Sequence, residues 1–271
     1  MRLLNNKITL KNLGLHSGKE CVLELEPVKS DFIILRSADD NQELPINRFK
    51  LNGTQRGSDY IFDDGSKIRT CEHVLAAVTG CGIWKDLKIT VHGGEMPSLD
   101  GCADILSQAI LNNSTNNDEK IIPLNLKTPV IISTDDKKRF VAAFPDDKEL
   151  FINYSVEYEY IGAQIFDYTA TPDNFLKDLS RARTFAYERD INYLKSHGLA
   201  MGGSLENAIV VGEKIQAKDG LRWDNEFVRH KILDLTGDLA SIGRPINAHI
   251  FALRAGHELH LKLAEKIKEM F

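Results

Sequence analysis

The chain has 271 residues, of which 42% are hydrophobic and 27% are charged, and its formal net charge is -5. This length can bury a sizeable core and suggests one large domain or two small ones, while the acidic balance argues against nucleic acid as a partner. No apolar run reaches the length of a membrane span and the N-terminus lacks the apolar region of a signal peptide, so we expect a cytoplasmic protein with at most peripheral membrane contact.

The cysteines of the chain lie far apart and form no C-x-x-C pair. In a reducing compartment such residues act more often as small buried hydrophobes than as disulfides or a zinc knot. They are Cys21, Cys71, Cys81 and Cys102, and Cys71 is notable because it adjoins a glutamate–histidine pair.

The first half of the chain combines short strands with two helices. Apolar alternation predicts strands at residues 21–28, 32–36 and 87–93. Between the last two of these strands, Thr70 is placed to cap a helix that ends at Gly80 or Gly82. A further helix is expected to start near Asp100, where apolar residues follow at helical spacing.

Residues 111–120, LNNSTNNDEK, are rich in Asn, Ser and Thr and poor in apolar side chains, which is typical of a linker. We therefore predict two domains, residues 1–117 and residues 118–271. The first would carry the helix with Glu72 and His73, and the second the helix with His230 and Asp234.

The second half repeats the plan of the first, with strands predicted at residues 129–134, 139–145, 150–158, 207–211 and 248–256. Thr171 followed by Pro172 marks a helix start, a long helix spans about 223–242, and an amphipathic helix runs to Phe271. Strands grouped with helices, rather than strict β-α-β alternation, favour an α+β fold. No glycine-rich phosphate-binding loop is present, which weighs against a nucleotide-hydrolysing or dinucleotide-binding fold.

The helix at 223–242 has two different faces. The apolar stripe consists of Val228, Ile232, Leu235 and Leu239. On the opposite side His230, Asp234 and Asp238 follow one another at i, i+4 and i+8, with Lys231 beside them. Such a face is usually solvated, but a histidine and an aspartate one turn apart can also bind one ion. Phe227 lies on the polar side, which a fully hydrated face would not favour.

The pair Glu72–His73 has two interpretations. Glu72 at a helix start complements the helix dipole, and His73 is then a core histidine. In the alternative, His73 binds a metal and Glu72 takes a proton from water on that metal. Together with His230 and Asp234 this gives two nitrogen donors and one oxygen donor, with a position left open as in catalytic zinc sites.

His257 lies in 254-RAGHELH-260, after a predicted strand and a glycine. A histidine at a strand end is equally well a surface residue. If it faces a metal, it can protonate a leaving amine or stabilise an oxyanion, with Asp238 orienting it.

Several segments, in this order along the chain, resemble the UDP-3-O-acyl-N-acetylglucosamine deacetylases and together span nearly its whole length. They are 14-GLHSG-18, 72-EHVLAAVTGCGI-83, 95-EMPSLDGCA-103, 180-SRARTFAYERDINYLKSHGLAMGGS-204, 207-NAIVV-211, 224-DNEFVRHKILDLTGDLA-240 and 256-GH-257. Several long matches in order are far more specific than any one short motif.

The resemblance implies a fold of two similar α+β domains, each a small β-sheet layered against a pair of α-helices, with the active site at their interface. It implies Zn²⁺ on His73, His230 and Asp234, with Fe²⁺ as an alternative metal. It also implies a reaction: hydrolytic removal of the N-acetyl group from UDP-3-O-acyl-N-acetylglucosamine, giving the free amine and acetate, in lipid A biosynthesis. We expect a monomer whose partner is this small-molecule substrate.

The resemblance further assigns roles in the reaction. Glu72 would be the general base, and His257 would protonate the amine with Asp238 behind it. Thr184 would help to bind the oxyanion.

Other matched residues would contact the substrate. Lys231 and Phe185 would contact the sugar and diphosphate. Gly203 and Ser204 would lie at the entrance of the hydrophobic passage for the acyl chain.

The sequence departs from the family pattern in three places. The family usually carries a Thr/Cys-Thr-Leu segment where this chain has 53-GTQRGSDYIF-62, it reads Gly-Ile-Asp-Asn where this chain has 82-GIWKD-86, and Tyr187 replaces another aromatic. Two alternatives follow: a paralogue that deacetylates a different N-acetyl sugar, and a catalytically silent lipid- or nucleotide-binding relative.

Overall fold

The computed structural model describes residues 1–54 and 56–271, and two parts of the chain in it share one topology. We call residues 8–112 the N-terminal repeat and residues 124–268 the C-terminal repeat. The N-terminal sheet has the order β2 (Ile8–Leu13), β3 (Glu20–Pro27), β9 (Leu87–His92), β4 (Ile33–Ser37) and β5 (Gln42–Pro45). Neighbouring strands are antiparallel except β9 and β4, which are parallel.

The C-terminal sheet repeats this order and these directions. It consists of β12 (Val130–Ser133), β13 (Phe140–Pro145), β19 (Ile246–Leu253), β14 (Leu150–Tyr158) and β15 (Gly162–Thr169), and β11 (Leu124–Asn125) pairs with β19. Only β19 and β14 are parallel among the five. The predicted α+β fold with two similar halves is therefore confirmed.

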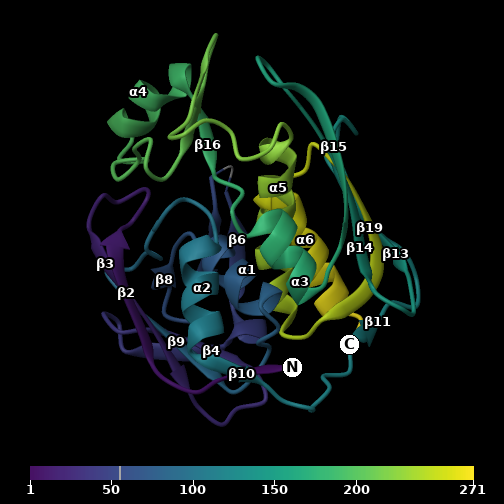
Figure 1. Ribbon diagram of the computed structural model, residues 1–271. Helices are drawn as coiled ribbons and strands as arrows, with labels where there is room; N and C mark the ends of the chain where they lie inside the picture. Colours follow the sequence, from purple (N-terminus) through teal and green to yellow (C-terminus); the bar gives the residue numbers. More distant parts are fainter. Residues whose placement is uncertain (55) are drawn as a thin grey trace.

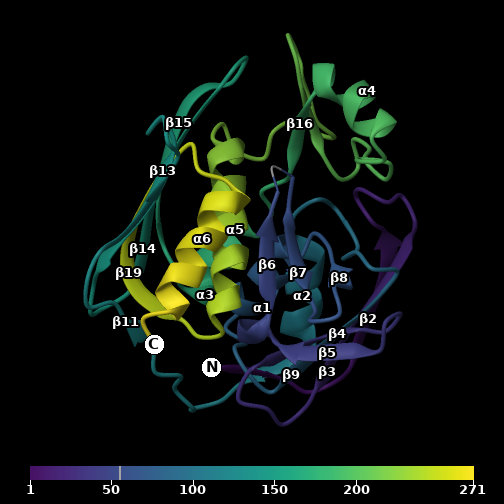
Figure 2. The ribbon, with the colours of Figure 1, turned by 180° about the vertical axis from the view of Figure 1, so that it is seen from behind.

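Two helices belong to each sheet. α1 (Glu72–Gly80) and α2 (Asp104–Asn112) flank β9 in the chain, just as α5 (Glu226–Leu239) and α6 (His257–Lys268) flank β19. Figures 1 and 2 show these helices between the two sheets, where α1 packs against α5. α1 and α5 are thus equivalent elements of the two repeats, and they meet at the centre of the molecule.

Burial follows from this layering. β3 and β4 bury alternate residues because only one face of their sheet is covered by helices. α5 is buried almost all round because α1 covers one side and β14 and β15 cover another. The solvated face considered for this helix is therefore excluded: His230, Asp234 and Asp238 are buried.

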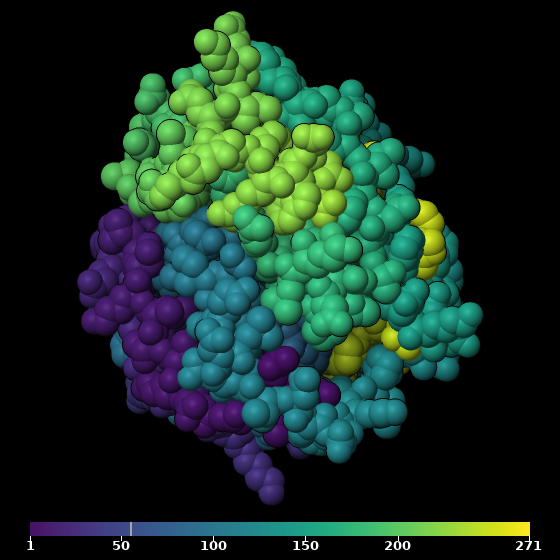
Figure 3. Space-filling model, in the orientation of Figure 1, coloured from purple at the N-terminus to yellow at the C-terminus, as the bar shows by residue number. Residues whose placement is uncertain are grey.

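Each repeat carries an insert between its fourth strand and its first helix. The first insert contains η1 (Ile46–Arg48) and a sheet of β6 (Lys50–Gly53), β7 (Ser58–Ile61) and β8 (Lys67–Ile68). The second contains α3 (Pro172–Asn174), η2 (Phe175–Leu179), β16 (Phe185–Tyr187), α4 (Glu188–Ser196), β17 (Ile209–Val211) and β18 (Ile215–Gln216). Figure 3 shows the light-green second insert against the purple N-terminal segment, where Met201 and Gly202 donate backbone hydrogen bonds to His16 and Leu15.

Only part of the expected linker, residues 111–120, lacks regular secondary structure. α2 extends to Asn112, and β10 (Ser114–Asn116) pairs with β1 (Arg2–Leu4), so the polar residues before Asn117 belong to regular structure. The domain division between residues 117 and 118 stays a prediction.

Two predicted helix starts were wrong. α1 begins at Glu72, and Thr70 does not cap it: its φ is +58° and its hydroxyl donates to Glu95 Oε1 at 3.3 Å. α2 begins at Asp104 rather than near Asp100. The start at Thr171 is confirmed, because its Oγ1 accepts from the backbone N–H of Asn174 at 3.1 Å. Among the described residues, no helix has the length and apolar character needed to cross a bilayer.

Candidate active site

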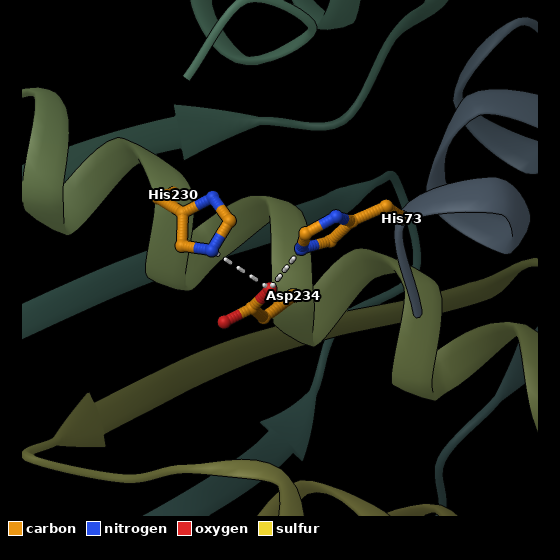
Figure 4. Close-up of side chains that lie close together, drawn as sticks. All are labelled: His73, His230 and Asp234. Carbon is orange, nitrogen blue, oxygen red and sulfur yellow. Dashed lines mark ion pairs between the residues drawn. The ribbon is translucent and has the colours of Figure 1, made fainter. Parts of the chain in front are cut away.

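Three side chains with metal-binding groups meet where α1 crosses α5 (Figure 4). His73 is the second residue of α1, and His230 and Asp234 lie one turn apart on α5. Nε2 of His73 lies 3.3 Å from Oδ1 of Asp234, and Nε2 of His230 lies 3.4 Å from the same oxygen. The structure thus brings the three predicted ligands together from the two repeats, and their role as ligands stays a prediction.

The close approach of the two helices depends on a glycine. Gly237 of α5 faces the backbone carbonyl of Glu72, and a Cβ at this position would collide with that carbonyl. A residue without a side chain at the crossing therefore lets α5 approach the first turn of α1, which carries His73.

The polar atoms of this cluster fit a cation. Oδ1 of Asp234 is buried and has no hydrogen-bond partner among the described residues. Nδ1 of His230 donates to the carbonyl oxygen of Ala182 at 3.0 Å, which leaves the Nε2 lone pair directed at Asp234. This carboxylate oxygen faces two imidazole nitrogens and accepts no hydrogen bond from the described residues. A metal ion bound between the three atoms would stabilise it. Two nitrogens and one oxygen suit zinc with one open position.

The charge states of two of the three residues, His230 and Asp234, suit a metal ligand. Burial lowers the pKa of His230 to about 3, so this imidazole is neutral at physiological pH, as a ligand must be. Burial would raise the pKa of Asp234, but His230 and the ammonium of Lys231 outweigh it and hold the pKa well below its usual range. The buried carboxyl group is therefore ionised.

Glu72 lies beside this cluster and is 2% exposed. Its Oε2 accepts a hydrogen bond from the backbone N–H of Ser58 at 2.9 Å. Burial raises its pKa, and the charges of His257 and His73 offset this only in part. A carboxyl group with a raised pKa suits a residue that accepts a proton and later releases it.

The segment that departs from the family pattern, residues 53–62, forms the wall behind Glu72. Ser58 of this segment donates to the carboxylate directly, and Gly57 lies so near that an added Cβ would be 3.0 Å from Oε1 of Glu72. Gln55 of the same segment lies outside the described residues.

His257 is the first residue of α6 and reaches the same place from the opposite side of α5. Its Nε2 lies 3.6 Å from Oδ2 of Asp234, and its Nδ1 lies 3.0 Å from Oδ2 of Asp238. Burial disfavours the imidazolium, but Asp238 and Asp234 outweigh this and raise the pKa of His257 to about 9. The predicted pairing of His257 with Asp238 therefore has a geometric basis.

Two contacts of Asp238, and one further contact that extends the network, were missed from the sequence. Nδ1 of His260 lies 2.9 Å from Oδ2 of Asp238, the Ser58 hydroxyl donates to Oδ1 of Asp238, and Nε2 of His260 lies 2.9 Å from the Tyr154 hydroxyl. The spacing of His257 and His260 at i and i+3 was a usable signal, because it puts both side chains on one helix face. No local signal points to Ser58 or Tyr154, which come from other elements.

A cavity of about 200 Å³ opens onto the cluster. Its polar lining includes Glu72, His73, His230, Asp234 and His257, and Thr184, Phe185 and Lys231 also line it. Its apolar lining includes Leu15, Leu194, Ala200 and Ala208. The cavity is thus lined by both charged and apolar side chains, and both inserts contribute to its wall.

Some of the residues predicted to contact substrate line this cavity, and others do not. Lys231 lies with its Nζ 2.6 Å from Oδ2 of Asp234 and 5.8 Å from the Phe185 ring centroid, so it borders both the cluster and the cavity. Thr184 precedes β16, and its backbone N–H donates to the carbonyl of Gly101 at 2.8 Å. Gly203 and Ser204, by contrast, do not line this cavity but lie in the segment between α4 and β17.

Comparison with known proteins places the chain in a family. The family model described as UDP-3-O-acyl N-acetylglycosamine deacetylase (LpxC) matches residues 1–269.

Curated relatives agree with this match. A UDP-3-O-acyl-N-acetylglucosamine deacetylase of Leptospira biflexa is 35% identical over 270 residues, which cover 97% of this chain and 88% of that protein. Proteins of the same name from Syntrophotalea carbinolica and Thermodesulfovibrio yellowstonii are 34% and 36% identical and cover 97% and 98% of this chain, and 86% and 91% of their own lengths. The family model and these relatives show that the chain belongs to the UDP-3-O-acyl N-acetylglycosamine deacetylase family.

Proposed function

We propose that this chain is a zinc-dependent hydrolase that removes the N-acetyl group from UDP-3-O-acyl-N-acetylglucosamine in lipid A biosynthesis. The observation that carries the proposal is the buried Oδ1 of Asp234, which has no hydrogen-bond partner among the described residues and faces Nε2 of His73 and of His230. Glu72 and His257 flank this oxygen inside a cavity, as an amide hydrolysis requires.

His73, His230 and Asp234 would hold the ion. Zinc bound there supplies Lewis-acid chemistry, since it lowers the pKa of a coordinated water to about 7 and polarises a carbonyl oxygen. Glu72 then accepts the proton of the attacking water. Its burial and its hydrogen bond from Ser58 keep the carboxylate in one orientation for this transfer.

His257 acts on the leaving group. Expelling an amine requires a proton, and an imidazole whose pKa is raised to about 9 carries one at neutral pH. Asp238 stabilises this charge through Nδ1, so that Nε2 remains available toward the cavity. Glu72 would supply the proton if His257 serves only to stabilise the oxyanion.

Other residues would bind the substrate. The Thr184 hydroxyl donates to the oxyanion, a type of contact worth about 3–4 kcal/mol when the donor is pre-aligned. Lys231 and Phe185 contact the sugar and the anionic diphosphate. The apolar lining at Leu15 and Leu194 suits the start of an acyl chain. Gly203 and Ser204, which match the family's entrance to the acyl passage, would line its continuation outside this cavity.

The test is a metal analysis combined with an acetate-release assay on the acylated UDP-sugar and its unacylated counterpart. We expect one zinc or iron ion per chain and turnover that depends on the acyl group. Acetate release that ignores the acyl group would support a paralogue acting on another N-acetyl sugar. A metal-free, inactive wild-type protein that still binds the substrate would support a silent binder.

A further inference from the structure

A second histidine lies behind the proposed catalytic pair. His260 is one turn after His257 on α6 and is fully buried. Its Nδ1 lies 2.9 Å from Oδ2 of Asp238 and its Nε2 lies 2.9 Å from the hydroxyl of Tyr154 on β14. No role in the reaction has been given to it.

Proton positions at Asp238 follow from its charge. An ionised carboxylate only accepts hydrogen bonds, so Nδ1 of His257 and Nδ1 of His260 both carry a proton, and both donate to Oδ2. Oδ1 accepts from the Ser58 hydroxyl. Three donors from two elements, β7 and α6, therefore fix the carboxylate, and the carboxylate fixes the tautomer of His257.

Tyr154 holds His260 in turn. Its hydroxyl lies 2.8 Å from the carbonyl oxygen of Ala255 and within hydrogen-bond distance of Nε2 of His260. Because Nδ1 of a neutral His260 is the donor to Asp238, Nε2 must accept, and it shares the single Tyr154 hydroxyl proton with the carbonyl oxygen of Ala255. Both ring nitrogens of the buried imidazole then have partners, so the ring has one orientation.

We propose that His260 is a positioning residue for the deacetylation: held by Tyr154, it fixes the Asp238 carboxylate and through it the orientation of the His257 imidazole. The proposal rests on the proposed function of His257. Asp238, His257 and His260 could also be taken for a second metal site. Their mutual hydrogen bonds already occupy the Asp238 carboxylate and both Nδ1 atoms, so these three side chains have no set of free donor atoms that could meet at one ion.

The chain offers matched variants for the test. His260→Asn keeps an N–H donor near the position of Nδ1, whereas His260→Leu has a similar size and no donor. Tyr154→Phe removes only the hydroxyl. Zinc content and Tm, measured first, identify any variant that fails to fold.

The kinetic result expected for zinc-loaded His260→Leu is a kcat about 10- to 100-fold below wild type at an unchanged KM, as for other partners of catalytic groups. His260→Asn should recover most of this loss. Tyr154→Phe should lower kcat in the wild-type background and have little effect in the His260→Asn background, because the asparagine has no Nε2 to anchor. Equal kcat values for His260→Leu and His260→Asn would overturn the proposal.

A second readout does not depend on turnover. Imidazole ¹H–¹⁵N spectra of zinc-loaded wild type should contain two Nδ1–H protons in strong hydrogen bonds. In His260→Leu the His257 signal should shift, and in His260→Asn it should stay near its wild-type position. An unmoved His257 signal in His260→Leu overturns the positioning role even if the protein is active. If wild type has these signals but releases no acetate, the proposed function fails instead. Two zinc ions per wild-type chain and one in His260→Leu would show a second metal site.

Discussion

Two clusters of the same composition lie on successive turns of α5. Asp234 with His73 and His230 forms the first, and Asp238 with His257 and His260 forms the second. In the first, a buried carboxylate oxygen has no partner among the described residues; in the second, both carboxylate oxygens accept hydrogen bonds. Residue types alone therefore do not distinguish a candidate metal site from a hydrogen-bond network. The distinguishing feature is whether the buried carboxylate oxygens already have hydrogen-bond partners.

The largest effect should come from the first cluster. Asp234→Asn removes the anionic ligand, so we expect zinc to be lost and kcat/KM to fall by at least about a thousandfold, since metal chemistry contributes several kcal/mol and each 1.36 kcal/mol is tenfold. Metal analysis after dialysis and the acetate assay measure both. Full zinc occupancy in this variant would contradict the assignment of the first cluster as the metal site.

Glu72→Gln tests the group beside the first cluster. The glutamine oxygen can still accept the hydrogen bond from Ser58 N–H, so the fold and the zinc content should be unchanged. Without a proton acceptor, kcat should fall by roughly 10²- to 10⁴-fold. Activity equal to that of wild type would refute the role of Glu72 as base.

Asp238→Asn is the direct counterpart of Asp234→Asn. We expect zinc to stay and kcat to fall by roughly 10- to 100-fold, because the network that orients His257 is disturbed while the ligands are untouched. Side-by-side metal analysis of the two asparagine variants sharpens the comparison. Equal zinc loss in both would show that the clusters act as one metal site.

His257 of the second cluster should also make the stability of the metal-free protein depend on pH. The pKa of His257 is raised to about 9, above about 6.5 for an unfolded histidine. Its contribution to stability is therefore full below pH ~6.5 and is lost as pH rises through ~9, up to about 3 kcal/mol. Urea unfolding at both ends of this window should show a steeper loss for wild type than for His257→Gln. Parallel losses would contradict the assignment.

The smallest effect is expected outside both clusters. Cys71 precedes Glu72 but is fully buried, its Sγ donates to the carbonyl of Ile68, and burial holds its thiol pKa well above the usual range. Cys71→Ala should change the unfolding free energy by about 1 kcal/mol and leave kcat unchanged. Rapid alkylation of this thiol in the folded protein would show that it is accessible after all.

Much of the scaffold could be predicted from local patterns. Strands such as β3, β4 and β14 alternate or are strongly apolar, and α5 has a clear stripe, so periodicity identified them. Short elements with weak patterns, such as β6–β8 and α4, were not identified, because their stability comes from tertiary contacts rather than from propensity. Thr70 fails as a cap for a similar reason: its hydroxyl serves Glu95 instead.

The site was predictable only where residues lie close in sequence or the family motif is present. His230 and Asp234 follow from helical spacing, whereas their meeting with His73 depends on how two equivalent helices cross. Ser58 reaches Asp238 across 180 residues, and Tyr154 reaches His260 across 106. No short-range pattern encodes such pairs, which arise only once the sheets and helices are packed.

The packing of α1 against α5 would link the affinity for the metal to the way the two repeats pack together. Because the proposed ligands come from equivalent helices of the two repeats, neither repeat would hold a complete site alone. The affinity for the ion would then depend on how the two repeats pack together. Substitutions along the crossing, such as at Gly237 against the Glu72 carbonyl, would then register as weaker zinc binding before either repeat loses its own fold.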